Sequence, residues 1–203
     1  TVHVYSDSLQ GVISENTHPV NLHPYAYSHK VAEDVVSYAH KQGLIDGIVI
    51  RLSNGFGTPV HNNPNCWKLL VNDLCMQSVR DRRLVLHSDG MQSRNFIPIS
   101  EICNIIYHLV CKKLLNNIDS YSNPINVGLE QSYRLLEIAT LIQDRSFLLF
   151  GYRPPISKVD NTNDDSRLML DYKIDTLLSL GYTFQYPIED EIDLLLKYCH
   201  TQL

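Results

Sequence analysis

The sequence of 203 residues lacks the long apolar run and the cysteine patterns that mark several classes of protein. No apolar run approaches the roughly 20 residues that span a bilayer, and no signal peptide stands at the start. We therefore expect a cytoplasmic protein without a membrane partner. The five cysteines form no Cys-x-x-Cys pair and no zinc spacing. We predict reduced thiols and no metal site.

Charge of one sign is not concentrated anywhere in the chain. The 17 Lys and Arg residues and the 22 Asp and Glu residues are interspersed, and the formal net charge is −5. No face of such a chain neutralises a run of phosphates, so we exclude nucleic acid as a partner. A small anionic ligand is compatible with this charge, because one or two arginines can bind it locally.

A third absence concerns glycine. A site that holds a dinucleotide needs a strand, a glycine-rich turn and a helix N-terminus for the pyrophosphate. The sequence contains no such turn, since Gly55-Phe56-Gly57 has neither a third glycine nor a helical pattern after it. Residues 1–5 alternate like the end of a strand, and we therefore expect the chain to be part of a longer protein.

What is present is an alternation of helical and strand patterns. Residues 25–42 have a helical pattern in which Val31 and Val35 recur at four-residue spacing and Glu33 takes a wetter position. The apolar run 47–52 is typical of a strand buried on both faces of a parallel sheet. This step from helix to buried strand predicts an α/β fold of the doubly wound type. Further helices are predicted at 66–81, 101–115, 132–143, 174–180 and 188–198, and further strands at 84–87, 94–99 and 124–127.

Six short blocks of the sequence follow one another in an order that is typical of one family. The blocks are TVHVY (1–5), YAYSHKVAE (25–33), RLSNGFG (51–57), RNFIPI (94–99), NVG (126–128) and LGY (180–182). They resemble the Ser/Thr-x-x-Val-Tyr, Tyr-x-x-Ser-Lys-x-x-x-Glu, Arg-x-x-Asn-x-x-Gly, Arg-Asp-Phe-Ile-His-Val, Asn-x-Gly and Leu-Gly-Trp/Phe patterns of the extended short-chain dehydrogenases. Each block alone is weak evidence, but six in the same order across nearly the whole chain are specific.

This resemblance implies a fold and an activity. The family comprises nucleotide-sugar epimerases, dehydratases and reductases, which act by hydride transfer at a sugar carbon with NAD or NADP. The implied fold is the C-terminal part of a doubly wound Rossmann-like parallel sheet with a smaller mixed α/β substrate-binding domain. Residues 1–60 would form the rear half of the dinucleotide-binding domain. Residues 61–203 would be mainly the substrate-binding domain, with segments near 94–128 returning to the Rossmann core. The family also indicates a homodimer through the helix 25–42.

The resemblance further implies roles for individual residues near the cofactor. Thr1 stands where the family's Ser or Thr bonds the reacting hydroxyl or carbonyl of the substrate, and Tyr25 stands where a tyrosine acts as the general acid and base. Tyr25, His29 and Leu52 would contact the cofactor. The implied catalytic residues are therefore Thr1, Tyr25 and His29.

Two other residues are implied to bind the nucleotide-sugar substrate. Asn54 would contact the diphosphate or the sugar, and Arg94 would pair with the diphosphate. The planar guanidinium of arginine suits this task, because it gives two charge-assisted hydrogen bonds to phosphate oxygens.

The sequence departs from the family pattern at the lysine. When Tyr25 and Glu33 are aligned with the pattern, His29 occupies the lysine position. A second registration pairs Tyr27 with Lys30 at a spacing of three residues, which a helix also allows. We prefer the first, because it keeps both the serine and the glutamate in place. Histidine is largely uncharged at neutral pH, so we expect it to activate the tyrosine less than lysine does.

Two other interpretations stay open beside the enzyme. The loss of the lysine could mark a catalytically impaired relative that only binds nucleotide sugar or serves a structural role. The same fold also serves reductases and dehydrogenases of non-sugar substrates. We expect the residue that selects NAD or NADP to lie outside these 203 residues. The sequence therefore does not distinguish the two cofactors.

Overall fold

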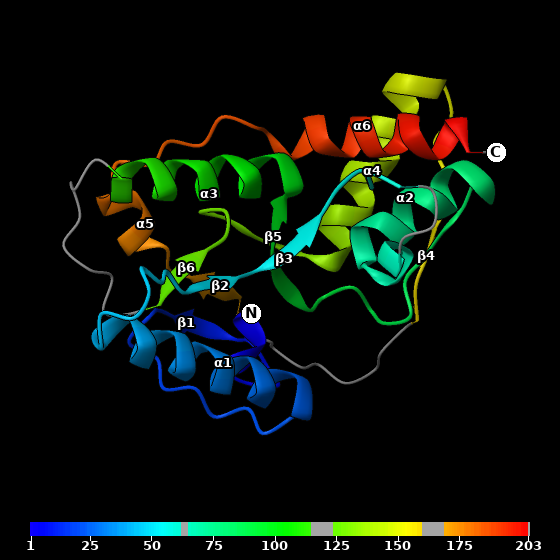
Figure 1. Ribbon diagram of the computed structural model, residues 1–203. Coiled ribbons are helices and arrows are strands. Elements are labelled where there is room, and N and C mark those ends of the chain that lie inside the picture. The colour runs from blue at the N-terminus through cyan, green and yellow to red at the C-terminus, as the bar shows by residue number, and fades with distance from the viewer. Residues whose placement is uncertain (62–64, 115–123, 160–168, 203) are drawn as a thin grey trace.

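Short strands form the centre of the molecule, and helices lie on both sides of them. The computed structural model describes residues 1–61, 65–114, 124–159 and 169–202. Helix α1 lies on one side of the strands, and α3 and α6 lie on the other, with α2 and α4 beside α6 (Figure 1). The helices are α1 (Pro24–Lys41), α2 (Leu70–Arg80), α3 (Ile99–Leu114), α4 (Leu135–Phe150), α5 (Asp175–Ser179) and α6 (Ile188–Thr201), with the 3-10 helices η1 (Val2–Val4) and η2 (Asn65–Lys68). None of these helices is both long and apolar enough to cross a membrane, over the part of the chain that is described.

Most of the strand pairs are parallel, as in an α/β fold. The strands are β1 (Gly11–Ile13), β2 (Ile50–Leu52), β3 (Asn54–Phe56), β4 (Leu84–Val85), β5 (Ser93–Pro98), β6 (Ile125–Val127), β7 (Ser132–Arg134), β8 (Ile156–Ser157) and β9 (Leu170–Tyr172). The parallel pairs are β1–β9, β2–β6, β3–β5 and β4–β8, and β5–β7 is antiparallel. At Ser53 the chain changes partner, from β6 to β5. Ser53 therefore lies between two strand pairs, β2–β6 and β3–β5.

Two hydrophobic clusters hold these elements together. The first lies among α2, α4 and α6 and includes Leu74, Ile138 and Leu195, none of which is exposed. The second joins α3 to β6 and β9 and includes Ile105, Ile125 and Tyr172. The apolar faces of the central strands are therefore covered from two directions, which gives the layered arrangement expected of an α/β protein.

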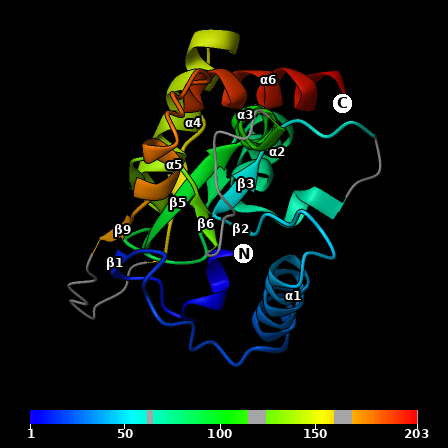
Figure 2. The same cartoon turned by 60° about the vertical axis from the view of Figure 1, so that its left-hand side comes forward.

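Helix α1 confirms the predicted helix, but it turns the other face to the fold. Val31 and Val35 are 45% and 61% exposed, whereas Glu33 is buried with Ala26. The expectation that Glu33 takes a wetter position is therefore wrong. The physical reason is Arg51 on β2, whose Nη2 lies 2.8 Å from Glu33 Oε2. Figure 2 shows α1 set apart from α2, α3 and α6, with the start of the chain between it and the strands.

The first residues form a turn of 3-10 helix instead of the expected strand end. Val4 N donates to Thr1 O at 3.3 Å, and Tyr5 N donates to Val2 O at 3.2 Å. Both a strand and this short helix bury Val2 and Val4, so the alternation of apolar residues does not distinguish them. In the described residues no strand pairs with this segment.

The predicted helix 132–143 begins later and ends later than expected. Residues Ser132–Arg134 form β7, which pairs with β5, and α4 follows from Leu135 to Phe150. Arg134 is extended, and its backbone N–H donates to Glu137 Oε2 at 2.7 Å. This carboxylate satisfies a backbone donor at the start of the helix and fixes the helix there.

Candidate functional site

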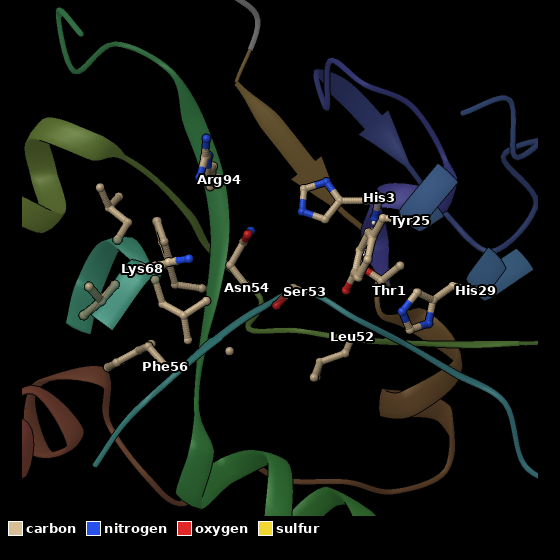
Figure 3. Close-up of a pocket in the computed structure, with 15 residues that line it drawn as sticks. Thr1, His3, Tyr25, His29, Leu52, Ser53, Asn54, Phe56, Lys68 and Arg94 are labelled. Carbon is tan, nitrogen blue, oxygen red and sulfur yellow. Dashed lines mark hydrogen bonds between the residues drawn. The ribbon is translucent and has the colours of Figure 1, made fainter. Parts of the chain in front are cut away.

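One pocket brings together all the residues that the sequence singled out. Its volume is about 510 Å³, and it lies where β2 and β3 meet η1, α1, β5 and the start of α2. The predicted residues that line it are Thr1, Tyr25, His29, Leu52, Asn54 and Arg94. Figure 3 shows Thr1, Tyr25 and His29 on one side of the pocket and Asn54, Lys68 and Arg94 on the other.

The first side, which we call the helix wall, consists of η1 and the beginning of α1. The ring centroids of Tyr25 and His29 are 4.6 Å apart, with the ring planes at 60°. His23 caps the helix, since its Nδ1 accepts from Tyr25 N at 3.3 Å. Lys30 forms an exposed ion pair with Asp34 at 2.5 Å and does not line the pocket. The pocket therefore contains the pair of the preferred registration.

Thr1 completes the helix wall at the first turn of the chain. Its Oγ1 accepts from His3 N at 3.4 Å, which caps η1. A hydroxyl both donates and accepts, so the proton of Thr1 Oγ1 stays available to a ligand in the pocket. The pocket thus holds two hydroxyl groups, of Thr1 and Tyr25, on one wall.

The opposite side, which we call the strand wall, consists of β3 and β5. Asn54 Nδ2 donates to Asn95 O at 2.8 Å, and no hydrogen bond uses the side-chain Oδ1 of Asn54 among the residues that the structure describes. Arg94 donates from Nη2 to Gln92 Oε1 at 3.3 Å, and no acid pairs with it among the residues that the structure describes. Burial lowers the pKa of the Arg94 guanidinium from its ordinary value. A desolvated cation without a counter-ion favours the binding of an anion.

Behind the strand wall, a buried amide fixes β5. Asn95 Nδ2 donates to Leu129 O at 2.8 Å and to Gln131 O at 3.2 Å, and Asn95 Oδ1 accepts from Leu129 N at 3.1 Å. A Cβ atom at Gly128 would overlap this Oδ1 and would lie 2.9 Å from Tyr172 Cδ1. Because Gly128 of the NVG block has no side chain, the Asn95 amide fits beside it.

The structure adds pocket residues that the sequence reasoning missed. His3 and Lys68 line the pocket, as do Phe56 and Phe96. His3 stands inside the first block, so its spacing from Thr1 was a usable signal. Lys68 comes from η2, and nothing in the sequence links it to the other residues. Among the residues that the structure describes, no aspartate or glutamate lines the pocket, so the charged side chains of this lining are all cationic.

The pocket residues fit one end of a dinucleotide cofactor. Leu52 offers an apolar surface, and Tyr25 and His29 offer hydrogen-bonding groups beside it. The Oγ of the neighbouring Ser53 is buried and has no hydrogen-bond partner in the described structure, so a ligand group would satisfy it. A glycine-rich turn for the pyrophosphate is not among the 203 residues. Of the elements that hold a dinucleotide, these residues could supply hydrogen bonds and apolar contacts at this pocket, and the glycine-rich turn that binds the pyrophosphate is not among them.

A comparison with protein families agrees with these observations. The model of the NAD dependent epimerase/dehydratase family matches residues 1–128, more than half of the chain. The chain belongs to the NAD-dependent epimerase/dehydratase family. Among curated relatives of this family member is UDP-glucuronic acid decarboxylase 1 of Danio rerio, 26% identical over 180 residues. The match covers 88% of this chain and 40% of that relative, so the chain spans less than half of the relative's length.

Solved structures show the same fold. A UDP-glucuronic acid 4-epimerase variant from Bacillus cereus, in complex with UDP-4-deoxy-4-fluoro-glucuronic acid and NAD, superposes with a TM-score of 0.76 at 18% identity. The match covers all of this chain and 60% of that one. A UDP-N-acetylglucosamine 4-epimerase from Methanobrevibacter ruminantium, in complex with UDP-N-acetylmuramic acid, gives 0.75 at 20% identity and covers 100% and 61%. The predicted fold class is confirmed: the epimerase/dehydratase chain has the α/β arrangement of part of a Rossmann-like fold.

Proposed function

We propose that this family member carries the substrate site and the acid–base tyrosine of an NAD(P)-dependent enzyme that acts on a nucleotide sugar. The single observation that carries the proposal is the pocket. Six residues from separate parts of the chain, chosen from the sequence for this chemistry, line one cavity of about 510 Å³. A set of unrelated surface residues would not be expected to converge in this way.

Tyr25 is the proposed general acid and base. Its hydroxyl borders the pocket beside Thr1, so the two groups can hydrogen-bond one sugar hydroxyl or carbonyl. In this arrangement Tyr25 takes the proton from the hydroxyl, and Thr1 orients that hydroxyl toward it. Hydride transfer at the same carbon is the chemistry that a bound nicotinamide supplies. Leu52 and His29 would hold that end of the cofactor.

The strand wall is the proposed binding site for the diphosphate. Arg94 has no acid partner among the described residues, and Lys68 adds a second cation to a pocket whose described lining contains no carboxylate. A diphosphate with a substituent at each end carries two negative charges, which these two cations can balance. Asn54 contributes an amide oxygen that can accept from a sugar or ribose hydroxyl.

The names of similar proteins support a nucleotide sugar as the substrate. The curated relative is a decarboxylase of UDP-glucuronic acid, and both solved structures are epimerases with bound UDP-linked sugars. They support a nucleoside diphosphate sugar as the substrate class. Epimerisation, dehydration, reduction and decarboxylation all begin from a hydroxyl or carbonyl held by Thr1 and Tyr25, so these residues alone do not select among them.

A catalytically impaired, nucleotide-sugar-binding protein is the second candidate function. The observation that favours it is His29, which lies next to Tyr25 at the position of the family's lysine. Without a permanently charged neighbour the phenolate is less stabilised, while the strand wall keeps its cations. The two candidates therefore predict the same binding and different turnover.

Domain division and dimerisation are further parts of the proposal. The cluster around β6 and β9 would belong to the dinucleotide-binding domain, and the cluster among α2, α4 and α6 to the substrate-binding domain. The outer face of α1 exposes Tyr27, Val31, Val35 and Tyr38. An exposed apolar face of this kind supports a homodimer through this helix.

The test is a calorimetric titration of the chain with UDP, dTDP, GDP, CDP and NAD(H). We expect one nucleoside diphosphate to bind, because its phosphates can pair with Arg94. Arg94→Ala should weaken this binding about 10- to 100-fold, since a hydrogen bond to a charged group contributes about 1.5–3 kcal/mol. NAD(H) should not bind measurably, because the pyrophosphate turn is not in this sequence.

Arg153→Ala is the matched control, since this arginine is exposed and pairs with Asp144. Its variant should bind as tightly as the unchanged chain. Equal binding by Arg94→Ala would contradict the proposed role of the strand wall. If none of the four diphosphates binds, the titration is repeated on a longer protein that contains these residues. Absence of binding there as well would refute the proposed substrate class.

A further inference from the structure

His3 lines the pocket, but none of the roles proposed above includes it. It borders the pocket described above and also a second cavity of about 390 Å³, which Asp7, Asn21 and His23 line with Tyr25. Its ring centroid is 6.5 Å from that of Tyr25. Figure 3 shows the His3 ring projecting from η1 toward the space between Arg94 and Tyr25.

The backbone of His3 is fixed, while its ring is not engaged. Asn21 Nδ2 donates to His3 O at 2.8 Å, and His3 N donates to Thr1 Oγ1 at 3.4 Å. Val2 and Val4 on either side are each 1% exposed and anchor the turn in the core. In the described part of the chain, no hydrogen bond uses either ring nitrogen of His3, so both are available to a ligand.

The surroundings of His3 favour the uncharged form of its ring. Burial, and next the positive charge of Arg94, lower the pKa of His3 from its ordinary value. A neutral imidazole offers one donor and one acceptor on opposite sides of the ring. A sugar hydroxyl, which also donates and accepts, matches these two groups, whereas a phosphate only accepts.

We propose that His3 binds a hydroxyl of the sugar and holds the sugar ring between Arg94 and Tyr25. This inference rests on the proposed function and deepens it. Arg94 then takes the diphosphate, His3 takes the glycosyl group, and Tyr25 meets the reacting carbon. His3 accordingly contributes to the difference in affinity between the sugar ester and the bare diphosphate.

The test compares nucleoside diphosphates with their glucose esters. UDP, dTDP, GDP and CDP are each titrated beside UDP-, dTDP-, GDP- and CDP-glucose, on the unchanged chain and on His3→Ala. We expect His3→Ala to weaken the binding of the glucose ester about three- to tenfold, the size of one net hydrogen bond. The affinity of the bare diphosphate should stay the same. His3→Gln, which keeps a donor and an acceptor, should recover part of the loss.

A second readout is the ring itself. In the chain labelled with ¹⁵N-histidine, the His3 ring signals should move further with the glucose ester than with the bare diphosphate. His18→Ala is the control variant, because this histidine is exposed and lines neither cavity. It should leave every affinity unchanged.

Two results would overturn the inference, and they differ. If a diphosphate binds through Arg94 but His3→Ala leaves the ratio of the two affinities unchanged, His3 does not bind the sugar and the proposed function stands. If neither diphosphates nor esters bind, to this chain or to a longer protein that contains these residues, the proposed function fails and this inference fails with it.

Discussion

The two walls of the pocket are built on different physical principles. Asn54 and Arg94 stand on strands that pair with each other, and behind them the Asn95 amide, which is not exposed at all, makes several hydrogen bonds. Tyr25 and His29 stand on a helix of 18 residues whose buried residues are only Ala26 and Glu33. Many small contacts hold the strand wall, whereas the helix wall depends on a few.

Within the helix wall, Val2 and Val4 anchor η1 in the core, whereas a buried ion pair ties α1 to the strands. Arg51 donates to Glu33 from Nε at 3.2 Å and from Nη2 at 2.8 Å, and the two side chains are 4% and 8% exposed. A buried pair gains little net stability over apolar residues, but it fixes geometry and is costly to break on one side. The comparison teaches that the position of Tyr25, the proposed general acid and base, depends on Glu33 and Arg51, which follow it by 8 and 26 residues.

The largest effect is expected from Glu33→Ala. Removal of the carboxylate leaves Arg51 charged and unpaired inside the fold, which should lower the free energy of unfolding by about 3–5 kcal/mol. Urea denaturation followed by circular dichroism measures this change. The neighbouring Asp34→Ala removes only an exposed ion pair and should cost at most about 1 kcal/mol.

A double variant separates charge from packing in this prediction. Glu33→Leu combined with Arg51→Met replaces the ion pair by apolar side chains and should recover most of the lost stability. If Glu33→Ala costs no more than Asp34→Ala, the ion pair does not hold α1, and the contrast between the walls disappears.

A smaller effect is expected from Asn95→Ala in the strand wall. The variant removes the partners of part-buried backbone groups of Leu129 and Gln131, which should cost about 1–3 kcal/mol. Because the ladder between β3 and β5 remains, the wall should keep its shape. Asn16→Ala, in an exposed loop, is the control and should stay within about 0.5 kcal/mol in the same urea titration. If Asn95→Ala lowers the free energy of unfolding more than Glu33→Ala does, the contrast between the two walls is reversed.

The smallest effect on stability is expected from His29→Lys. This residue is exposed at the rim of the pocket, so the free energy of unfolding should change by less than about 0.5 kcal/mol. Turnover by a longer protein that contains these residues should rise near neutral pH, because a charged lysine stabilises the phenolate of Tyr25. Steady-state rates over a range of pH check this. Loss of turnover would mean that the site is adapted to histidine.

The sequence predicted the elements and the pocket residues better than it predicted the contacts between them. The helix at 25–42 and the strand at 94–99 follow from periodicity, and the structure confirms both with small shifts of their ends. The six residues of the site came from the family resemblance, and the structure gathers them in one cavity. Periodicity alone would not have chosen them.

The wrong and missing predictions concern residues whose partners are distant in the sequence. A glutamate on an amphipathic helix is assigned to water unless its partner is known, and Arg51 lies 18 residues after Glu33. The extended residues 132–134 looked helical because their pairing with β5 is invisible to a local pattern. Lys68 was missed for the same reason, since its place in the pocket depends on the whole fold.

Gly128 and Asn95 place a constraint on how this sequence can change. Any side chain at 128 would occupy the place of the Asn95 amide, and without that amide the Leu129 backbone loses its partners. A side chain at position 128 is therefore incompatible with the Asn95 amide in its present place, so we expect such a change to require a change at position 95. In relatives that have another residue at one of these positions, we expect the other position to differ as well.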